Sequence, residues 1–240
     1  MFPYDPVLCG AVKTPPQSIG DVLVTLRTIQ ATCIDGDGLK WFNWLYLQVT
    51  EAVETRVASG GFAAPSWLAE LDVQFARFYF SALEGALLRQ PISDCWRVLF
   101  GCRDQTSIAR IQFALAGINA HINHDLSEAI VATCEATATM PQHCAPQFRD
   151  YTSLNTTLDS IIESAKRTLN VRLLGDALPP ASHLEDLIAA WSVSAARESA
   201  WNNAEVLWHL HQVPPLDSTF MDTLDGLTTV TNKAILVPIP

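Results

Sequence analysis

Apolar residues recur at helical spacing along almost the entire chain, and this periodicity restricts the possible folds more than any other feature. Neither alternating apolar and polar runs nor Asn-Gly hairpin turns interrupt it. Apolar residues make up 49% of the 240 residues and charged residues only 17%, which suffices for a sizeable core. The pattern therefore predicts an all-α protein, a multi-helix bundle of about eight or nine helices.

Capping residues and prolines set the ends of the predicted helices. Ser18 and Asp21 have capping-box spacing, and the prolines at 214 and 215 stop the helix before them. The predicted helices cover Ser18–Cys33, Leu39–Ala58, Pro65–Leu88, Ile92–Phe100, Ser107–Asn123, Leu126–Ala138, Pro146–Leu169, His183–His211 and Leu216–Thr229. No linker separates two cores, so residues 1–240 are expected to form a single helical domain. It would carry an N-terminal extension over 1–17 and an apolar C-terminal tail over 230–240.

The charge and the motifs of the chain argue against several partners. With 15 Lys and Arg against 25 Asp and Glu, the formal charge is −10, which disfavours binding to nucleic acids and anionic membranes. No apolar stretch is long enough to span a bilayer and no secretory signal begins the chain, so we expect a cytoplasmic protein. The six cysteines lack zinc or CxxC spacing, and without a Walker or GxGxxG motif no nucleotide cofactor is expected.

Polar residues among the core positions of a helix are the informative ones, because burying an unpaired charge is costly. On the helix that begins at Pro65, Asp72 lies about 40° from the centre of the apolar stripe. It therefore needs a buried partner: a His, an Arg, a metal or a group of amide donors. A structural carboxylate that ties two helices together and a functional group fit this position equally well.

The helix over Leu39–Ala58 shows a milder form of the same pattern. Tyr46 belongs to its apolar stripe, and Asn43 lies within the stripe. An amide bond to a neighbouring helix is the favoured role of Asn43, with a ligand contact as the other possibility. Asp37, in the segment Asp35-Gly-Asp37-Gly, lacks the later ligands of a calcium loop and is expected to cap this helix.

Residues 116–128, AGINAHINHDLSE, form the densest polar cluster on an otherwise apolar helix. Asn119 and His121 border its apolar stripe, and His124 is expected at the surface. In a continuous helix, His121 and Asp125 stack one turn apart, as an oriented imidazole base or two metal ligands would. Asp125 and Glu128 also fit a capping box that would start a new helix, and this cap is slightly favoured. A helix break lined with Asn and His is itself a common place for a site.

The helix over His183–His211 carries one further inward charge. A second apolar line through Trp201 and Trp208 indicates that its buried face rotates, which turns Glu205 and His209 toward water. Arg197 then points inward, as a partner for Asp72 or for an anionic group of a ligand.

Four segments resemble the uncharacterised helical family catalogued as domain of unknown function 5995: DGDGLKWFNWLYLQVTEAV, FAAPSWLAELDVQFARFYFSAL, ALAGINAHINHDLSEAIV and ARESAWNNAEVLW. The likeness covers most of Asp35 to Leu210, a family-like core, and Asn119-Ala120-His121-Ile122-Asn123 is its most specific part. The resemblance implies an all-helical fold and a shared pattern of Asp37, Asn43, Tyr46, Asp72, Asn119, His121, Asp125, Arg197 and Trp201. It implies no particular activity. The cysteines and the apolar tail depart from the family pattern, which leaves room for a specialised role such as a step in secondary metabolism.

Two functions remain open, and the first is preferred; a third, zinc-dependent hydrolysis of lipids or phosphodiesters, needs more His and Asp ligands than the sequence places together. In the first, the protein is an enzyme for a small, largely apolar molecule held between helices, where cyclisation, isomerisation and hydrolysis all fit. Asp72, His121 and Asp125 would act as general acid and base or bind one divalent metal. The substrate-binding residues would be Asn43, Tyr46, Asn119, Arg197 and Trp201. In the second, the protein is a non-catalytic binding or interaction module, and Asp72 pairs with Arg197 or His121 in a structural network.

Overall fold

The computed structural model describes residues 2–173, 192–213 and 215–238, with the backbone alone at 170–173. Every regular element in these ranges is helical, which confirms the all-α class. The elements are α1 (Asp5–Val12), α2 (Ile19–Thr32), α3 (Leu39–Ala58), α4 (Pro65–Leu87), α5 (Asp94–Gly101), α6 (Arg110–Ala120), η1 (His121–Asp125), α7 (Leu126–Ala136), α8 (Pro146–Ser153), α9 (Asn155–Leu173), α11 (Val193–Leu210) and α12 (Leu216–Ile235).

Local chemistry accounts for several helix ends. The Ser18 hydroxyl accepts a hydrogen bond from the Asp21 amide (3.1 Å), and the Asp21 carboxylate accepts one from the Gln17 amide (3.0 Å), so the predicted cap of α2 is confirmed. Proline occupies the first turn of α4 and of α8, where its missing N–H costs nothing. These signals are local, so the sequence alone was sufficient to place these helix starts.

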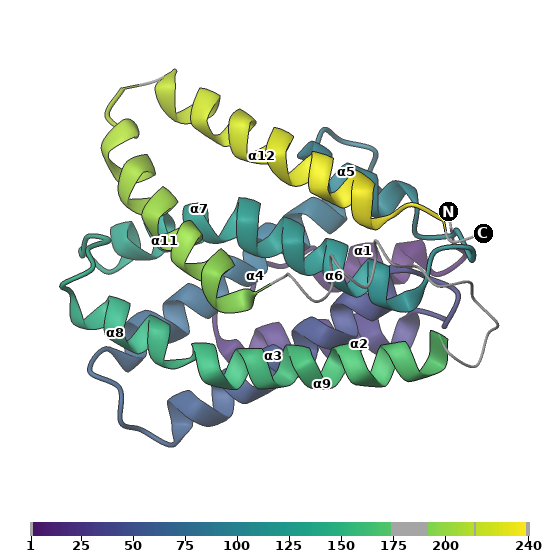
Figure 1. Cartoon of the computed structure of the whole chain (residues 1–240), viewed down its shortest axis with the longest axis horizontal. Coiled ribbons are helices and arrows are strands. Elements are labelled where there is room, and N and C mark those ends of the chain that lie inside the picture. Colours follow the sequence, from purple (N-terminus) through teal and green to yellow (C-terminus); the bar gives the residue numbers. More distant parts are fainter. Residues whose placement is uncertain (1, 174–191, 214, 239–240) are drawn as a thin grey trace.

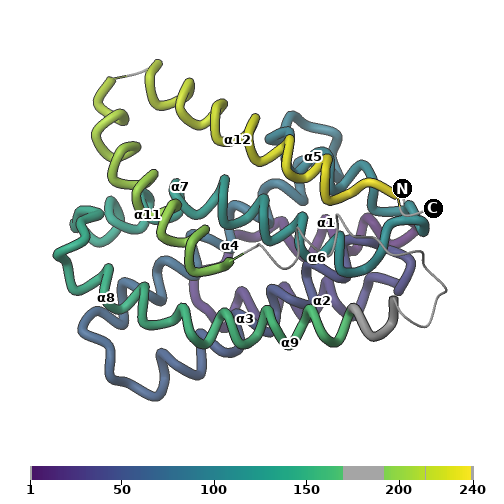
Figure 2. Tube along the Cα trace, in the orientation of Figure 1, coloured from purple at the N-terminus to yellow at the C-terminus, as the bar shows by residue number. Residues whose placement is uncertain are grey.

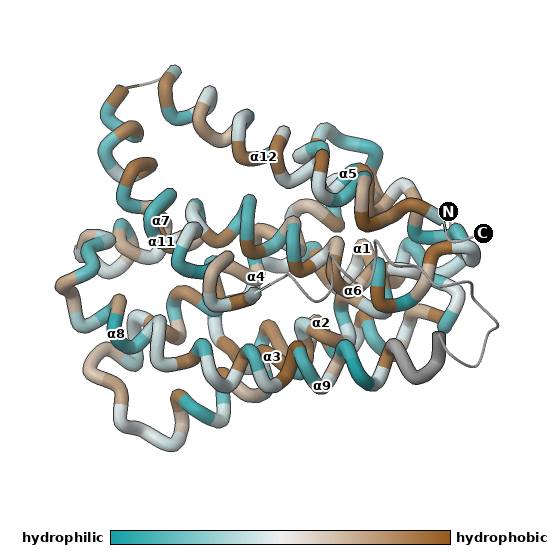
Figure 3. The backbone as a smooth tube through the Cα atoms, viewed as in Figure 1, coloured by the Kyte–Doolittle hydropathy of each residue, from teal (hydrophilic) through white to brown (hydrophobic). Residues whose placement is uncertain are grey.

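The rod formed by α6, η1 and α7 runs lengthwise through the molecule, and the other helices pack around it (Figures 1 and 2). It contacts α3 and α4, α11 packs along α7, and α12 crosses over α5 and α6. Apolar and polar residues alternate along each helix (Figure 3), as expected for helices that each bury one face. The central rod is buried on nearly all sides, which is why the polar side chains of residues 119–125 lie inside the protein.

Close backbone packing joins the rod to α3. A Cβ atom on Gly117 would lie 2.2 Å from Cγ of Phe42, far inside van der Waals contact. Only glycine lets α6 approach α3 this closely, and the approach places Phe42 and Tyr46 of α3 beside the ring of His121. Gly117 therefore positions the polar segment that follows it.

The structure differs from the predicted elements in three places. The extension over 1–17 contains α1, whose Leu8 and Val12 belong to the core. The predicted helix Pro146–Leu169 breaks at Leu154 into α8 and α9. The last helix continues past Thr229 to Ile235, because Ile235 and Leu236 are buried and two carbonyls there accept hydrogen bonds from Gln112. The start of the predicted helix His183–His211 lies outside the described residues. In the described ranges no helix is long and apolar enough to cross a membrane.

Candidate functional site

A π-helical turn at residues 121–125 connects α6 to α7 without a break. The backbone of Asp125 is helical, at φ −75° and ψ −31°, and its side chain caps no N–H group. The capping-box interpretation of Asp125 is therefore wrong. The wider π turn keeps His121 and Asp125 one turn apart on the same inner side of the rod, and such turns occur often at functional sites.

The Asp125 carboxylate is the centre of a hydrogen-bonded cluster. It accepts bonds from Nδ1 of His121 (2.9 Å), Nδ1 of His124 (2.7 Å) and Nε1 of Trp96 (3.0 Å). An ionised carboxylate only accepts, so both imidazoles carry a proton on Nδ1. Burial alone raises the pKa of Asp125, but the bonds from the two histidines outweigh burial and lower this pKa below its usual range. We call these four residues the Asp125 cluster. His124, expected at the surface, is only 12% exposed because it belongs to this cluster.

The imidazole of His121 lies in an aromatic enclosure. Its ring stacks on Phe75 of α4 at 3.4 Å between centroids and meets the edge of Tyr46 at 4.7 Å. Burial lowers the pKa of His121, although Asp125 opposes the shift, so the ring is neutral at pH 7. With the proton on Nδ1, Nε2 presents a free lone pair, and this buried atom has no hydrogen-bond partner. The bond to Asp125 thus fixes the tautomer and orientation of the neutral His121 ring.

Asp72 is a buried carboxylic acid of α4 that has no partner among the described residues. It is 8% exposed and forms neither a hydrogen bond nor an ion pair with any residue that the structure describes. Burial, with a smaller contribution from the charge of Glu54, raises the pKa of Asp72 to about 7. The inward position predicted from helical phase is confirmed, whereas the expected partner is not found within the described residues. The side chain therefore exchanges its proton near neutral pH.

Asp72 borders a small cavity between α3, α4, α9 and α11, which we call the Asp72 cavity. The space in it that a water-sized molecule can reach is about 50 Å³. It is lined by Tyr46, Val49, Val53, Leu68, Leu71, Asp72, Phe75, Leu126, Leu154, Leu158 and Arg197. A single water needs roughly 10–15 Å³ on such a measure, and drug-sized ligands occupy about 300–1,000 Å³. The cavity therefore suits a few waters or one small molecule.

Tyr46 and Phe75 separate this cavity from His121. Both aromatic rings line the cavity and contact the imidazole on their other side, whereas His121 does not line it. The Tyr46 hydroxyl is buried without a hydrogen bond; Thr50 lies near it but without bonding geometry. Asp72 and His121 thus belong to one region of the protein but not to one open site.

Arg197 points inward as expected, and the partners that the structure gives it come from α8 and α9. Nε donates to Oδ1 of Asn155 (2.8 Å), Nη2 donates to the carbonyl of Tyr151 (2.9 Å), and the guanidinium lies 3.8 Å from the centre of the Tyr151 ring. Trp201, one turn further along α11, is fully buried against Trp67 and Tyr151. Arg197 forms part of the cavity wall, and Trp201 supports α11 behind it.

The two asparagines bind neighbouring helices. Asn43 donates to the carbonyl of Leu26 (2.9 Å) and to Gln30 (3.0 Å), which is the favoured role for its amide. Asn119 donates to Asn232 (2.9 Å) and to the carbonyl of Thr228 (3.2 Å), and so ties α6 to α12. Neither lines the Asp72 cavity.

The three candidate metal ligands do not converge. Within the described ranges no three His, Cys, Asp or Glu side chains form a group that could hold a metal ion. Asp72 faces the cavity, whereas His121 bonds to Asp125 behind the aromatic wall. These residues therefore do not fit a shared divalent metal, and no step of the proposed chemistry uses one.

The sequence did not indicate two interior residues that donate hydrogen bonds to buried carboxylates, Trp96 and Arg103. Trp96 donates to Asp125, and Arg103 binds the fully buried Asp37 through Nε (2.9 Å) and Nη2. Asp37 also accepts the Leu39 amide (3.0 Å), the local bond of the predicted cap, and the Tyr4 hydroxyl (3.0 Å). Arg103 follows α5 in an irregular segment, where no periodicity marks an inward residue.

Comparison with known proteins gives a family but no activity. No curated protein and no solved structure matches the chain. A family model described as a family of unknown function (DUF5995) matches residues 19–238 and so extends beyond the resemblance over Asp35 to Leu210 on both sides. The match includes every element from α2 to α12 and all eight candidate site residues. The chain therefore belongs to the DUF5995 family.

Proposed function

We propose that the protein is an enzyme that acts on a small, largely apolar molecule in the Asp72 cavity, with Asp72 as the general acid and base. The observation that carries this proposal is the unpartnered carboxyl of Asp72, buried among leucines and aromatic rings with a pKa raised to about 7. A general acid or base works best when its pKa lies near the working pH, and burial is a common way to reach that value.

The other cavity residues support this assignment. Tyr46 lines the same cavity, and its buried hydroxyl, which has no hydrogen bond within the described residues, can bind a polar atom of the substrate. Arg197 places a positive charge in the wall, opposite in sign to an oxyanion that forms when a proton is removed beside a carbonyl. We assign His121 and Asp125 a positioning role, because the His121 ring contacts Phe75 and Tyr46 from behind and Asp125 holds that ring by a hydrogen bond.

A non-catalytic binding module is the second candidate. The Asp125 cluster favours it, because its carboxylate is fully bonded within the protein and has no need of a ligand. In this case a protonated Asp72 donates a hydrogen bond to a carbonyl compound but removes no proton from it. Both candidates predict binding in the Asp72 cavity, and only the first predicts proton transfer.

Proton exchange separates the two candidates. Cyclopentanone is a suitable probe because it is small and apolar, has one carbonyl oxygen and bears exchangeable protons beside it. In D₂O, a carboxylate base removes such a proton to give the enolate and a deuteron returns from solvent, which NMR follows directly. We expect wild-type protein to exceed the buffer rate, with a rate that rises through an apparent pKa of about 7.

The control variant is Glu70→Gln, on the same helix and outside the cavity lining. Asp72→Asn should fall to the buffer rate, while Glu70→Gln keeps the wild-type rate. Binding of cyclopentanone, seen as chemical-shift changes in Tyr46 and Phe75, without exchange at any pH would support the binding module. Absence of both binding and exchange would count against both candidates.

A further inference from the structure

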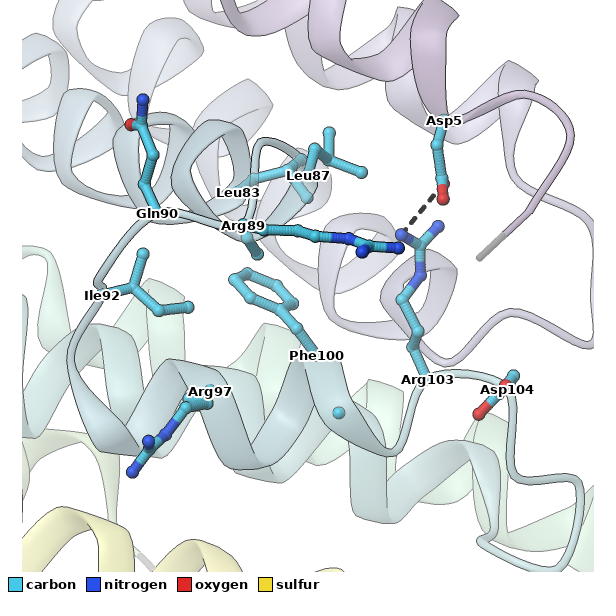
Figure 4. A pocket seen from close by; sticks show the side chains of 12 residues that line it. Asp5, Leu83, Leu87, Arg89, Gln90, Ile92, Arg97, Phe100, Arg103 and Asp104 are labelled. Carbon is cyan, nitrogen blue, oxygen red and sulfur yellow. Dashed lines mark ion pairs between the residues drawn. The ribbon is translucent and has the colours of Figure 1, made fainter.

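A second, larger pocket lies at the opposite end of α4, between α1, the α4–α5 connection and α5 (Figure 4). Its volume is about 380 Å³ on the measure used for the Asp72 cavity, which falls within the roughly 300–1,000 Å³ of ligand pockets. Leu87 of its wall is 15 residues from Asp72, or about 22 Å along the helix axis. The pocket is lined by Asp5, Leu83, Ala86, Leu87, Arg89, Gln90, Ile92, Arg97, Phe100, Gly101, Arg103 and Asp104.

Three arginines surround the apolar floor of this pocket. Arg97 is mostly exposed and pairs with Asp94 (2.6 Å), and Arg103 is bonded to Asp37 and lies 3.1 Å from Oδ1 of Asp5. Arg89 differs from both, since its side chain has no hydrogen bond or ion pair with any residue in the described ranges. Figure 4 shows its side chain extending across the pocket toward Arg103. A guanidinium without a carboxylate partner beside an apolar floor can pair with the anionic group of a ligand.

The backbone fixes Arg89 in this position. Its N–H donates to the carbonyl of Ala86 (3.2 Å) and that of Gln90 to Gly85 (2.8 Å), which together form the Schellman motif that ends α4. Arg89 occupies the left-handed position of this motif, at φ 57°, where glycine is preferred. Ala138 occupies the same position after α7, at φ 52°, without lining this pocket. Ala138 is therefore a matched control position for substitutions at Arg89.

The acidic groups of the pocket limit the charge of the ligand. Asp5 is 8% exposed, accepts a bond from the Phe2 amide (2.9 Å) and keeps Oδ1 without a hydrogen bond, although Arg103 lies at ion-pair distance. Asp104 is exposed at the rim. Arg97 already pairs with Asp94, and Arg103 with Asp37 and Asp5, so Arg89 is the one guanidinium of the lining without a carboxylate partner among the described residues. A multiply charged phosphate would face both acids, whereas a single carboxylate matches one guanidinium.

We infer that this pocket binds an amphipathic monocarboxylate, whose head group pairs with Arg89 and whose apolar body packs on Leu83, Leu87, Ile92 and Phe100. This inference is independent of the proposed chemistry at Asp72, because the two cavities share no lining residue. Octanoate is the probe, with octanol as the same chain without charge and acetate as the charge without the chain.

Calorimetry with these three probes tests the inference. We expect octanoate to bind at least tenfold more tightly than octanol or acetate, and Arg89→Gly to weaken octanoate binding at least tenfold. Ala138→Gly, the matched change, and Asp72→Asn should both keep wild-type affinity. Because glycine is preferred at φ 57°, Arg89→Gly should unfold at the wild-type temperature or above, so a loss of binding would not reflect unfolding. Equal binding of octanoate and octanol, unchanged affinity in Arg89→Gly, or no binding of octanoate would each overturn the inference.

Discussion

Asp125 and Asp72 are both buried carboxylates of the same interior region, yet their surroundings differ completely. Asp125 receives hydrogen bonds from Trp96, His121 and His124, and its pKa is lowered. Asp72 receives none from the described residues, and its pKa rises to about 7. Burial raises the pKa of both, so the difference comes mainly from the histidine donors around Asp125. A satisfied carboxylate stabilises the fold, whereas an unsatisfied one is retained at a cost in stability and is free for chemistry.

Removing the centre of the Asp125 cluster should have the largest effect on stability. In Asp125→Ala, three buried donors lose their acceptor, and we expect a loss of about 3–5 kcal/mol in the free energy of unfolding. Urea denaturation at pH 7 measures it. Glu128→Gln, three residues further along the rod, is the control and should change little. A loss below about 1 kcal/mol in Asp125→Ala would contradict the structural role assigned to the cluster.

Asp72→Asn should raise the free energy of unfolding at alkaline pH, the opposite of the effect of Asp125→Ala. The Asp72 carboxyl ionises near pH 3.8 in the unfolded chain and near 7 in the folded protein. Its contribution to the free energy of unfolding is therefore fully present below about pH 4 and is lost as the pH rises to about 7. At pH 8 the buried charge therefore costs up to about 4 kcal/mol, which the amide avoids. Urea denaturation at pH 4.5 and 8 should show the variant gaining on the wild type only at the higher pH.

An independent measurement sharpens the same prediction. Carboxyl ¹³C shifts of the folded protein should show one aspartate signal that titrates near pH 7 and disappears in Asp72→Asn. If Asp72 titrates near 4 instead, it has a partner or solvent contact, and the contrast with Asp125 would no longer hold.

Trp96→Phe tests whether a single donor sustains the low pKa of Asp125. The indole N–H lies 3.0 Å from the carboxylate, and a phenyl ring cannot replace it. We expect a loss of about 1–3 kcal/mol, together with an upward shift of the pKa of Asp125. Urea denaturation gives the first and carboxyl ¹³C titration the second. Trp67→Phe, which removes another buried indole whose N–H has no hydrogen bond within the described residues, separates loss of volume from loss of the bond.

Tyr46→Phe should have the smallest effect. The Tyr46 hydroxyl is buried without a hydrogen bond, so its removal leaves no group unsatisfied, and stability should change by less than about 1 kcal/mol in either direction. If the hydroxyl binds the substrate, the same variant should weaken cyclopentanone binding. A large loss of stability in denaturation experiments would show that the hydroxyl already has a partner.

The fold was predictable where its signals are local. The bounds of α3 and the start of α4 follow from apolar periodicity and from proline at the first turn. The break at Leu154 and the extension of α12 to Ile235 carry no such signal, since both depend on neighbours distant in the chain. The bond from Gln112 to the end of α12 joins residues 123 positions apart, and no window of sequence contains it.

The candidate site was predictable in part for the same reason. Helical phase placed Asp72 and Arg197 inside, and the spacing of four residues brought His121 and Asp125 together. Phase reports the direction of a side chain but not its partner. The sequence did not indicate Trp96 and Arg103, which donate to the buried carboxylates of Asp125 and Asp37. The expected pairing of Asp72 is not seen in the described residues.

The sequence by itself determined that this chain is helical and which faces of its helices are buried, because both follow from the spacing of apolar residues within a single helix. Only the tertiary structure decided which of its buried acids is satisfied. That outcome depends on donors supplied by other helices, such as Trp96 of α5 for Asp125, and on the aromatic rings that keep His121 out of the Asp72 cavity. Distances of a few ångströms between separate helices set these contacts, and apolar periodicity does not encode them.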